Sequence, residues 1–293
     1  MTPRVRLRPS PLRVLAMPLR ILAWIAESTG RLAIKRVVGL AEILAVLLAT
    51  MRLGLSPASW TPPVRQVLAR QLLFTAVDSV SVSIRFGAAV GVLVIVQAAM
   101  WVDSFGINTE VITPLLWKAI VRELAPLLAC LVVIGRSGVA IATELATMRT
   151  GGEIELLDAQ GVDPMNMVVM PRVLAVVIST FCLALLIATV MVATGYAIGW
   201  AMDAIRVSWR TFLSEIAGQL NRRDLYFFVP KTLLSSGFAA AICCLDGLQV
   251  KGSTTEVPRV SSRAGIRALT AVLAVSAILS LVIYGRILVF QIG

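Results

Sequence analysis

Histidine does not occur in this chain of 293 residues. Its absence excludes catalytic triads that use an imidazole, histidine ligation of zinc or haem, and the usual proton shuttle. The four cysteines lie in apolar segments, and the adjacent Cys243 and Cys244 do not form a CxxC sequence. We therefore expect buried thiols and no metal site. The chain also lacks the GxxxxGK(S/T) loop that holds nucleotide phosphates, so we expect neither a bound cofactor nor nucleotide hydrolysis from it.

Charged residues are scarce, and acids are scarcer than bases. Charged residues make up 15% of the chain and hydrophobic residues 58%, and the mean hydropathy of +0.89 is far from that of soluble proteins. We therefore predict an integral membrane protein. The net charge of +11 is concentrated at the start, where residues 1–36 hold eight bases and one acid. Such an arm could bind nucleic acid, but beside membrane spans we expect it to lie on anionic lipid instead.

The apolar segments predict an all-α membrane protein with five spans, because a bilayer core requires about 20 apolar residues per helix. The predicted spans are Val77–Trp101, Leu115–Met148, Val173–Trp200, Leu225–Val250 and Ala268–Phe290. Pro126, Gly135 and Gly138 interrupt the second and predict a broken or re-entrant helix. A sixth stretch, residues 32–51, contains three charges and is interpreted as an interfacial helix. The chain is thus divided into a basic arm with this helix, residues 1–70, and a five-helix domain, residues 71–293.

The distribution of basic residues predicts the orientation of these spans. With five spans, the loops on the side of the N-terminus carry 14 Lys and Arg, and the opposite loops carry 4. The positive-inside rule then places the N-terminus in the cytoplasm and the C-terminus outside, as in a multi-pass protein of the inner membrane.

Two small-xxx-small patterns, Gly87 to Gly91 and Gly195 to Gly199, predict close approach between helices. Packing within the chain and dimerisation would both use them, and we favour packing within the chain.

Charged residues in the predicted second span indicate a functional region, because hydrocarbon penalises a charged side chain by ~2.5 to 3.5 kcal/mol. Adjacent helical residues point about 100° apart, so Arg122 and Glu123 are not expected to face the same partner. We expect Glu123 to face a substrate cavity and pair with Lys231 or a lipid head group, and Arg122 to reach the interface. Snorkelling of all three is the alternative. Lipid-tail contacts are expected from one face of the first span: Val94, Gln97 and Trp101.

Two further charges of that span, Arg136 and Glu144, are predicted to form a structural joint. Arg136 lies 13 residues after Glu123, a separation of about 20 Å in a continuous helix, which is too far for a pair. We expect Arg136 to cap carbonyls freed by the break at Gly135 and Gly138, or to pair with Glu144.

A short acidic helix is predicted between the second and third spans, over residues 153–162. Thr150 and Glu153 fit a capping box, and Gly161 and Pro164 stop the helix. Its apolar positions Ile154, Leu157 and Gly161 fall on one face, which could dock into a groove of a partner. A plain connecting turn is the alternative interpretation.

The strings RELAPLL, GRSGVAIATELATMR and GGEIELLDAQGVDPMNMVVMPRVLA, within residues 122–175, resemble the MlaE/YrbE family of permeases. Members of this family are the membrane subunits of ABC transporters that work with MCE proteins to move lipids. The close resemblance covers about fifty residues and a looser one covers residues 70–293. The loop of residues 246–267 departs from the family's pattern.

This resemblance implies a transporter subunit rather than an enzyme. It implies a homodimer of five-span permeases, phospholipid as cargo, an MCE partner in the periplasm, and ATP bound by a separate ATPase subunit. The short acidic helix would be the coupling helix that contacts the ATPase. The residues expected to take part in that contact are Glu153, Glu155, Leu157, Asp158, Gly161, Asp163 and Pro164.

Two other classes of function are weighed against this interpretation. A secondary transporter would also use charges inside spans, but it would show paired inverted halves, which the sequence does not display. A membrane enzyme acting on lipids would need a carboxylate or Lys as its general base, and no clustered pair is evident. An ATPase and an MCE-domain protein that copurify with the chain would distinguish the permease from both.

Overall fold

The structure is a computed structural model, and it describes residues 37–105, 116–202, 208–219, 222–250 and 254–292. The described elements are all helical, as predicted. The chain forms two compact units, residues 1–45 and residues 46–293. The second unit contains the predicted permease domain and is described below. The predicted boundary at residue 70 falls inside the continuous helix α2. The predicted division into a basic arm and a five-helix domain stays a prediction.

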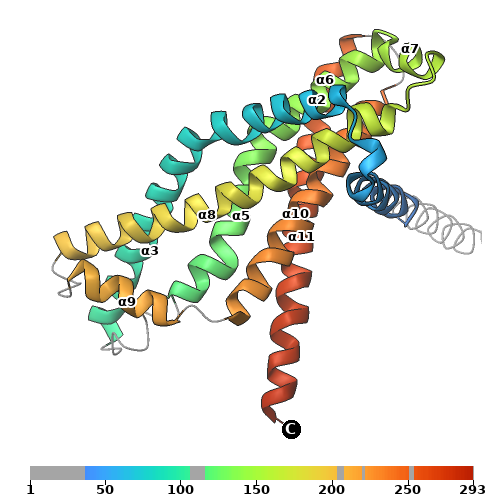
Figure 1. The fold of residues 1–293 in the computed structure, drawn as a ribbon. Coiled ribbons are helices and arrows are strands. Elements are labelled where there is room, and N and C mark those ends of the chain that lie inside the picture. The colour runs from blue at the N-terminus through green and yellow to red at the C-terminus, as the bar shows by residue number, and fades with distance from the viewer. Residues whose placement is uncertain (1–36, 106–115, 203–207, 220–221, 251–253, 293) are drawn as a thin grey trace, which may run out of the picture. The chain divides into compact units, whose positions relative to one another are not determined.

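The helices of the second unit follow one another with short connections (Figure 1). They are α2 (Pro62–Leu72), α3 (Asp78–Phe105), α5 (Ala125–Val133), α6 (Val139–Thr150), α7 (Glu153–Ala159), α8 (Met170–Ala201), α9 (Trp209–Gln219), α10 (Arg222–Leu248) and α11 (Val257–Ile292). Four π-helical turns lie within or before these helices: η2 (Leu73–Val77), η3 (Ile120–Leu124), η4 (Ile134–Gly138) and η5 (Met165–Val169). Two 3-10 turns also occur in this unit: η1 (Pro57–Ser59) and η6 (Thr254–Glu256).

Six helices of the described chain are long and apolar enough to cross a membrane, where the sequence predicted five. Five of the six contain the predicted spans or most of their length. The sixth is Val37–Leu55, which overlaps the stretch interpreted as interfacial and meets the criterion by length and composition. The first predicted span is longer than expected, because α2 continues through η2 into α3 and the helix runs without interruption from Pro62.

The second span is continuous from Leu116 to Thr150, so the prediction of a broken or re-entrant helix is wrong. The π turns η3 and η4 replace the expected breaks. Pro126 is accommodated in the first turn of α5, directly after η3, where the missing N–H and the proline ring are tolerated. Gly135 and Gly138 both lie in η4, and the helix widens there instead of ending.

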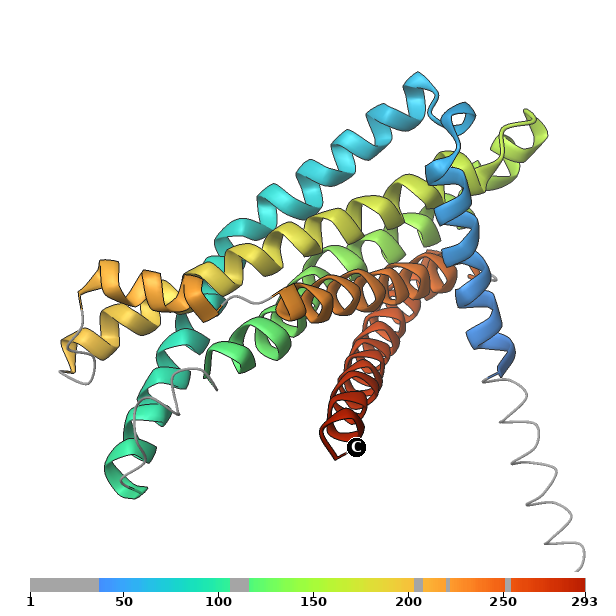
Figure 2. The same cartoon turned by 60° about the horizontal axis from the view of Figure 1, so that its bottom comes forward.

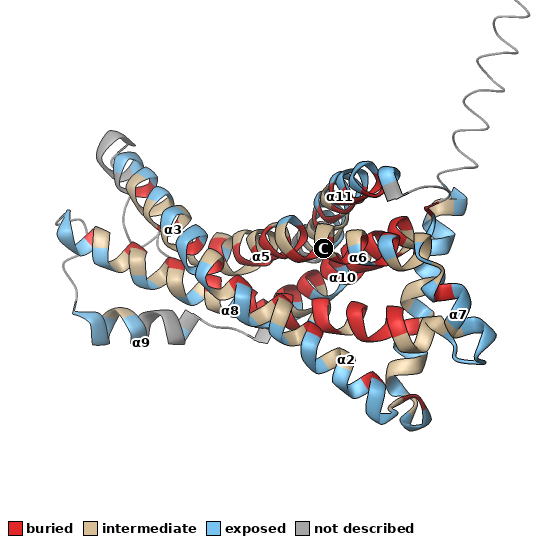
Figure 3. Ribbon diagram, turned by 90° about the horizontal axis from the view of Figure 1, so that it is seen from above, coloured by how far each residue is buried: buried red, intermediate tan, exposed pale blue. Residues whose placement is uncertain are grey.

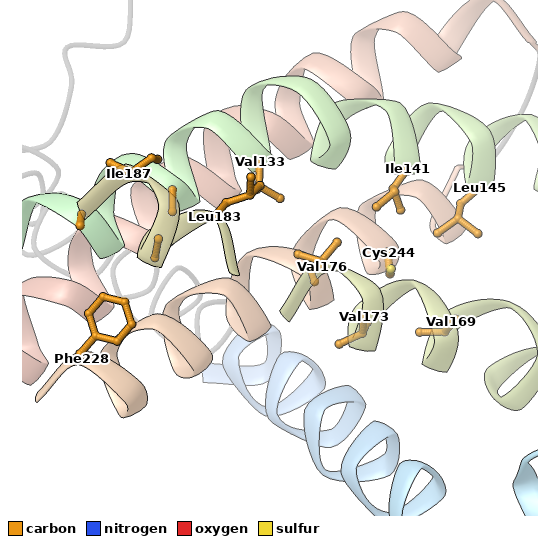
Figure 4. Close-up of a cluster of buried hydrophobic side chains, with 14 of the residues drawn as sticks. Val133, Ile141, Leu145, Val169, Val173, Val176, Leu183, Ile187, Phe228 and Cys244 are labelled. Carbon is orange, nitrogen blue, oxygen red and sulfur yellow. The ribbon is translucent and has the colours of Figure 1, made fainter. Parts of the chain in front are cut away.

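The core lies between the second span, α8 and α10, and α8 packs against α2, α3, α5 and α10. Figure 4 shows side chains of this cluster, including Val133, Leu145, Val173 and Ile187, meeting from helices far apart in sequence. In the most apolar 18 residues of the Asp224–Leu248 helix, 67% of the residues are buried. In the corresponding part of the Val257–Ile283 helix, 17% are buried. The α10 helix is therefore central, and most of α11 faces outward (Figure 3).

The small-xxx-small patterns are used within the chain, where α3 lies against α8, and this preference of the sequence interpretation is confirmed. A Cβ added at Gly91 would come within 2.6 Å of the Met191 carbonyl oxygen, and one at Gly195 within 2.7 Å of the Ile95 side chain. Such distances leave no room for any side chain. At the far end of α8, Tyr196 packs its ring against Trp209 of α9, with centroids 4.8 Å apart, and Figure 2 shows the two helices side by side.

Candidate functional site

A buried polar cluster joins η3 to α10 and α11. The Lys231 ammonium pairs with the Glu123 carboxylate and also donates a hydrogen bond to the Ser280 hydroxyl at 2.7 Å. Ser280 in turn donates to Glu123 Oε1 at 2.9 Å. The side chain of Lys231 is 3% exposed and that of Glu123 is 37% exposed. The predicted pairing of Glu123 with Lys231 is confirmed, and the carboxylate of that pair is the partner with access to the surroundings.

Arg122 completes the cluster with a second ion pair on the same helix α10. Its guanidinium contacts Asp224 Oδ1 at 2.5 and 2.6 Å and lies 4.3 Å from the centre of the Phe227 ring. The Arg122 side chain is 11% exposed, and the expectation that it lies at the membrane interface stays a prediction.

Arg122 and Glu123 both face α10, contrary to the argument from their 100° separation. Their partners, Asp224 and Lys231, lie seven residues apart, which is about 10 Å along α10. Each long side chain therefore reaches a different turn of the same helix, and the π turn η3 alters the local helical geometry. The four charges sum to zero, and this balance offsets part of their desolvation.

The residues expected to contact lipid tails occupy different environments. Val94 packs against the hydrophobic core, whereas Gln97 and Trp101 are exposed on α3. A substrate role for these three residues stays a prediction.

Arg136 connects the second span to the start of α3. Its guanidinium donates to the Phe74 carbonyl at 3.0 Å and to Ser79 Oγ at 3.2 Å, and it pairs with Asp78 at 3.0 Å. The Asp78 N–H bonds to the Leu73 carbonyl in the π turn η2, which leaves the Phe74 carbonyl to accept from Arg136. The capped carbonyl thus belongs to a neighbouring helix and not to the region of Gly135 and Gly138.

Glu144 pairs with Arg172 at 2.8 Å, so the alternative of an Arg136–Glu144 pair is wrong. Eight residues separate Arg136 from Glu144, about 12 Å along the helix. Arg172, from the Pro-Arg sequence, also donates to the Val168 carbonyl at 2.9 Å and is buried. It ties the end of α6 to the start of α8, on both sides of α7. Arg172 lies within one of the strings that resemble the permease family, and the sequence analysis gave it no role of its own.

The acidic helix α7 forms, but it is shorter than predicted and begins differently. It spans seven residues, Glu153–Ala159, and Gly152 precedes it with φ of 75°. Thr150 bonds back to the Ala146 carbonyl at 3.0 Å. The predicted capping box is therefore wrong, because glycine at a positive φ makes the turn that a threonine cap would otherwise have initiated.

The helix ends at Ala159, three residues before the predicted end, but the predicted stop at Gly161 is confirmed. Gly161 has φ of 74°, its N–H bonds to the Asp158 carbonyl, and the Val162 N–H bonds to the Leu157 carbonyl, both at 3.0 Å. These two bonds form a Schellman motif. Asp163 then accepts a hydrogen bond from the Met165 N–H at 2.9 Å and, with Pro164, begins the next helix.

The apolar face predicted to dock on a partner packs on the chain itself. Ile154 is buried, and Leu157 packs against the same core. The outward apolar residues are Leu156, which is 58% exposed, and Val162. Adjacent leucines in the sequence EIELL point in different directions, so only one of them can lie on the packed face.

The same short helix carries exposed acids. Glu153 and Asp158 are exposed, and Glu155 pairs with Arg149 at 2.7 Å. The accessible surface of this segment therefore carries one leucine and several carboxylates.

Comparison with known proteins supports a single family. Residues 68–282 match the family described as Permease MlaE. A probable ABC transporter permease of Rickettsia typhi is 26% identical over 227 residues, 78% of this chain and 85% of that protein. The intermembrane phospholipid transport system permease protein MlaE of Haemophilus influenzae is 23% identical over 225 residues, 75% of this chain and 83% of that protein.

A plant protein shows a similar relationship. Protein TRIGALACTOSYLDIACYLGLYCEROL 1, chloroplastic, of Arabidopsis thaliana is 26% identical over 211 residues, 72% of this chain and 59% of that protein. Since the family match covers well over half of the sequence, the chain belongs to the MlaE permease family and is a membrane permease subunit of an ABC transporter rather than an enzyme.

Proposed function

We propose that this permease moves phospholipids between the inner membrane and an MCE-domain partner in the periplasm. The relative from Haemophilus influenzae carries phospholipid transport in its name, which supports the class of cargo. The observation that carries the proposal within this chain is the cluster of Glu123, Lys231, Arg122 and Asp224. It places one partly exposed carboxylate among otherwise buried charges in a membrane span, where a lipid head group could replace an internal partner.

The chain acts in this proposal as one half of a homodimer and binds no nucleotide. ATP is hydrolysed by a cytoplasmic ATPase, and α7 transmits the motion. The ion pair of Arg172 with Glu144 supports this role, because it joins the helices before and after α7 into one hairpin. In the proposed orientation five helices span the membrane and Val37–Leu55 lies along its surface. The N-terminus and α7 then lie in the cytoplasm and the C-terminus in the periplasm, in agreement with the distribution of basic residues.

Mass spectrometry of lipid retained by the purified complex tests the cargo. We expect phospholipid to copurify with the parent complex. Glu123→Gln alone would leave the Lys231 ammonium without its counter-ion, so the informative variant is the double change Glu123→Gln with Lys231→Met, which removes both charges. Arg85→Gln is the matched control, because exposed Arg85 bonds to Ser81 of its own helix.

Lower phospholipid retention in the double variant, with normal retention in Arg85→Gln, supports the proposal. Equal retention in the parent and the double variant would remove the cluster from the substrate path. Absence of phospholipid from every preparation would contradict the proposed cargo.

A further inference from the structure

The first three turns of α11 carry an exposed row of arginines. Arg259, Arg263 and Arg267 follow one another at intervals of four residues and therefore share one face of the helix. The opposite face, which includes Ser261 and Ala268, is buried against the rest of the chain. We call the three residues the α11 arginine face.

Nearby acids neutralise this face only in part. Arg267 pairs with Asp246 of α10, whose side chain is 4% exposed. The positive charge of Arg263 also attracts the Asp246 carboxylate. Glu256 lies one turn before Arg259 and is exposed. The face thus carries three guanidinium groups and has two carboxylates nearby, one of them buried, so the outward surface keeps a net positive charge.

The length of α11 places this face in the head-group layer. A helix of 36 residues is about 54 Å long, whereas the hydrocarbon core is about 30 Å thick. The uninterrupted apolar run begins at Ala268, directly after Arg267. Arg263 then lies about 6 Å and Arg259 about 12 Å beyond Arg267 along the axis. Since each head-group layer is about 5 to 7 Å thick, Arg267 and Arg263 lie within it and Arg259 lies at its outer edge.

The same end of the molecule carries α7. The start of α11 contacts the end of α6 through Val257 and Ala146, and Thr143 donates a hydrogen bond to Ser261 at 2.8 Å. The arginine face therefore meets the leaflet on the side of α7. Farther along α11, the exposed side chains of Leu273 and Leu281 offer an apolar surface at acyl-chain depth.

We propose that the α11 arginine face binds the phosphate group of an anionic phospholipid in the leaflet on the α7 side. Guanidinium groups match phosphate oxygens in charge and in bidentate geometry. Most of α11 faces outward, so a lipid can approach from the bilayer without entering the protein. This site is separate from the cluster around Glu123, and its failure would leave the proposed cargo untouched.

The test is a lipid titration of the purified full-length chain, read by native mass spectrometry. The probes are phosphatidylglycerol and, as the neutral reference, phosphatidylcholine. The variant is Arg259→Gln with Arg263→Gln, which spares the pair between Arg267 and Asp246. We expect binding of phosphatidylglycerol to weaken about 30-fold, because each basic side chain near an anionic surface contributes a factor of about five. Phosphatidylcholine binding should not change.

Two further variants make the result specific. Lys118→Gln with Arg85→Gln removes two exposed cations elsewhere and should leave the titration unchanged. Arg259→Lys with Arg263→Lys keeps the charge and should restore most of the binding. The proposal is overturned if the glutamine variant binds phosphatidylglycerol like the parent, or if the control pair loses as much. The proposal is also overturned if the glutamine variant binds lipid like the parent but no longer copurifies with its ATPase. The α11 arginine face would then bind a protein and not a lipid.

Discussion

Leu156 is the residue on which contact between α7 and an ATPase should depend most strongly. It is 58% exposed, so it offers an apolar side chain for a small docking surface. Fully burying a leucine contributes about 1.5 to 3 kcal/mol, so burial of its exposed part would contribute roughly 1 to 2 kcal/mol. In Leu156→Asp this gain is lost and a carboxylate enters an apolar groove, for a total of about 3 to 5 kcal/mol. The complex should then bind roughly 100- to 5,000-fold more weakly.

The assay is copurification of the tagged permease with its ATPase, together with the rate of ATP hydrolysis. We expect Leu156→Asp to be folded and inserted in the membrane, because the side chain is exposed in the isolated chain. Leu157→Asp should instead lower the yield of folded protein, because Leu157 packs against the chain's own core. Asp158→Asn, at the exposed rim, should weaken binding by less than about tenfold and change its salt dependence. If Leu156→Asp retains the ATPase at parental affinity, this docking surface is wrong.

Three further predictions concern the interior. Glu123→Gln should destabilise the chain by about 3 to 5 kcal/mol in thermal unfolding, because it leaves the buried Lys231 ammonium without its counter-ion. Lys231→Met should cost less, because the Glu123 carboxylate that it leaves unpaired is partly exposed. The reverse order would contradict the assigned burial. Arg172→Gln should cost about 1 to 3 kcal/mol, whereas Arg149→Gln, at a more exposed pair, should cost less than about 1 kcal/mol; equal effects would exclude a joining role for Arg172. Gly91→Ala should destabilise by about 1 to 3 kcal/mol, and Gly135→Ala should be tolerated because nothing lies within 4 Å of an added Cβ; a tolerated Gly91→Ala would contradict the close packing of α3 on α8.

The membrane architecture could be predicted because long apolar runs have a single solution in a bilayer. The π turns could not be predicted, since the proline and glycines that create them are also typical of a broken helix. This difference explains the error in the second span. It also explains why Arg122 and Glu123 both face α10, which regular helical geometry argued against.

Ion pairs were predictable only where few partners were available. Lys231 is buried near Glu123, and this pair could be proposed from depth and opposite charge alone. Arg136 and Glu144 each had partners on other helices, Asp78 and Arg172, and the helical crossings that bring them together are not encoded in local spacing. For α7, periodicity identified the apolar face, but amphipathic spacing does not show whether that face covers the chain's own core or a partner.

ATP-dependent movement of phospholipid in proteoliposomes tests the central claim most directly. The permease, its ATPase and an MCE-domain partner would be reconstituted with labelled phospholipid, and transfer to or from the MCE partner would be followed with and without ATP. We predict that transfer requires ATP, is lost in Leu156→Asp, and falls in the neutral double variant of Glu123 and Lys231 while Arg85→Gln transfers at the parental rate. Transfer at the same rate without ATP, or without this subunit, would contradict the account.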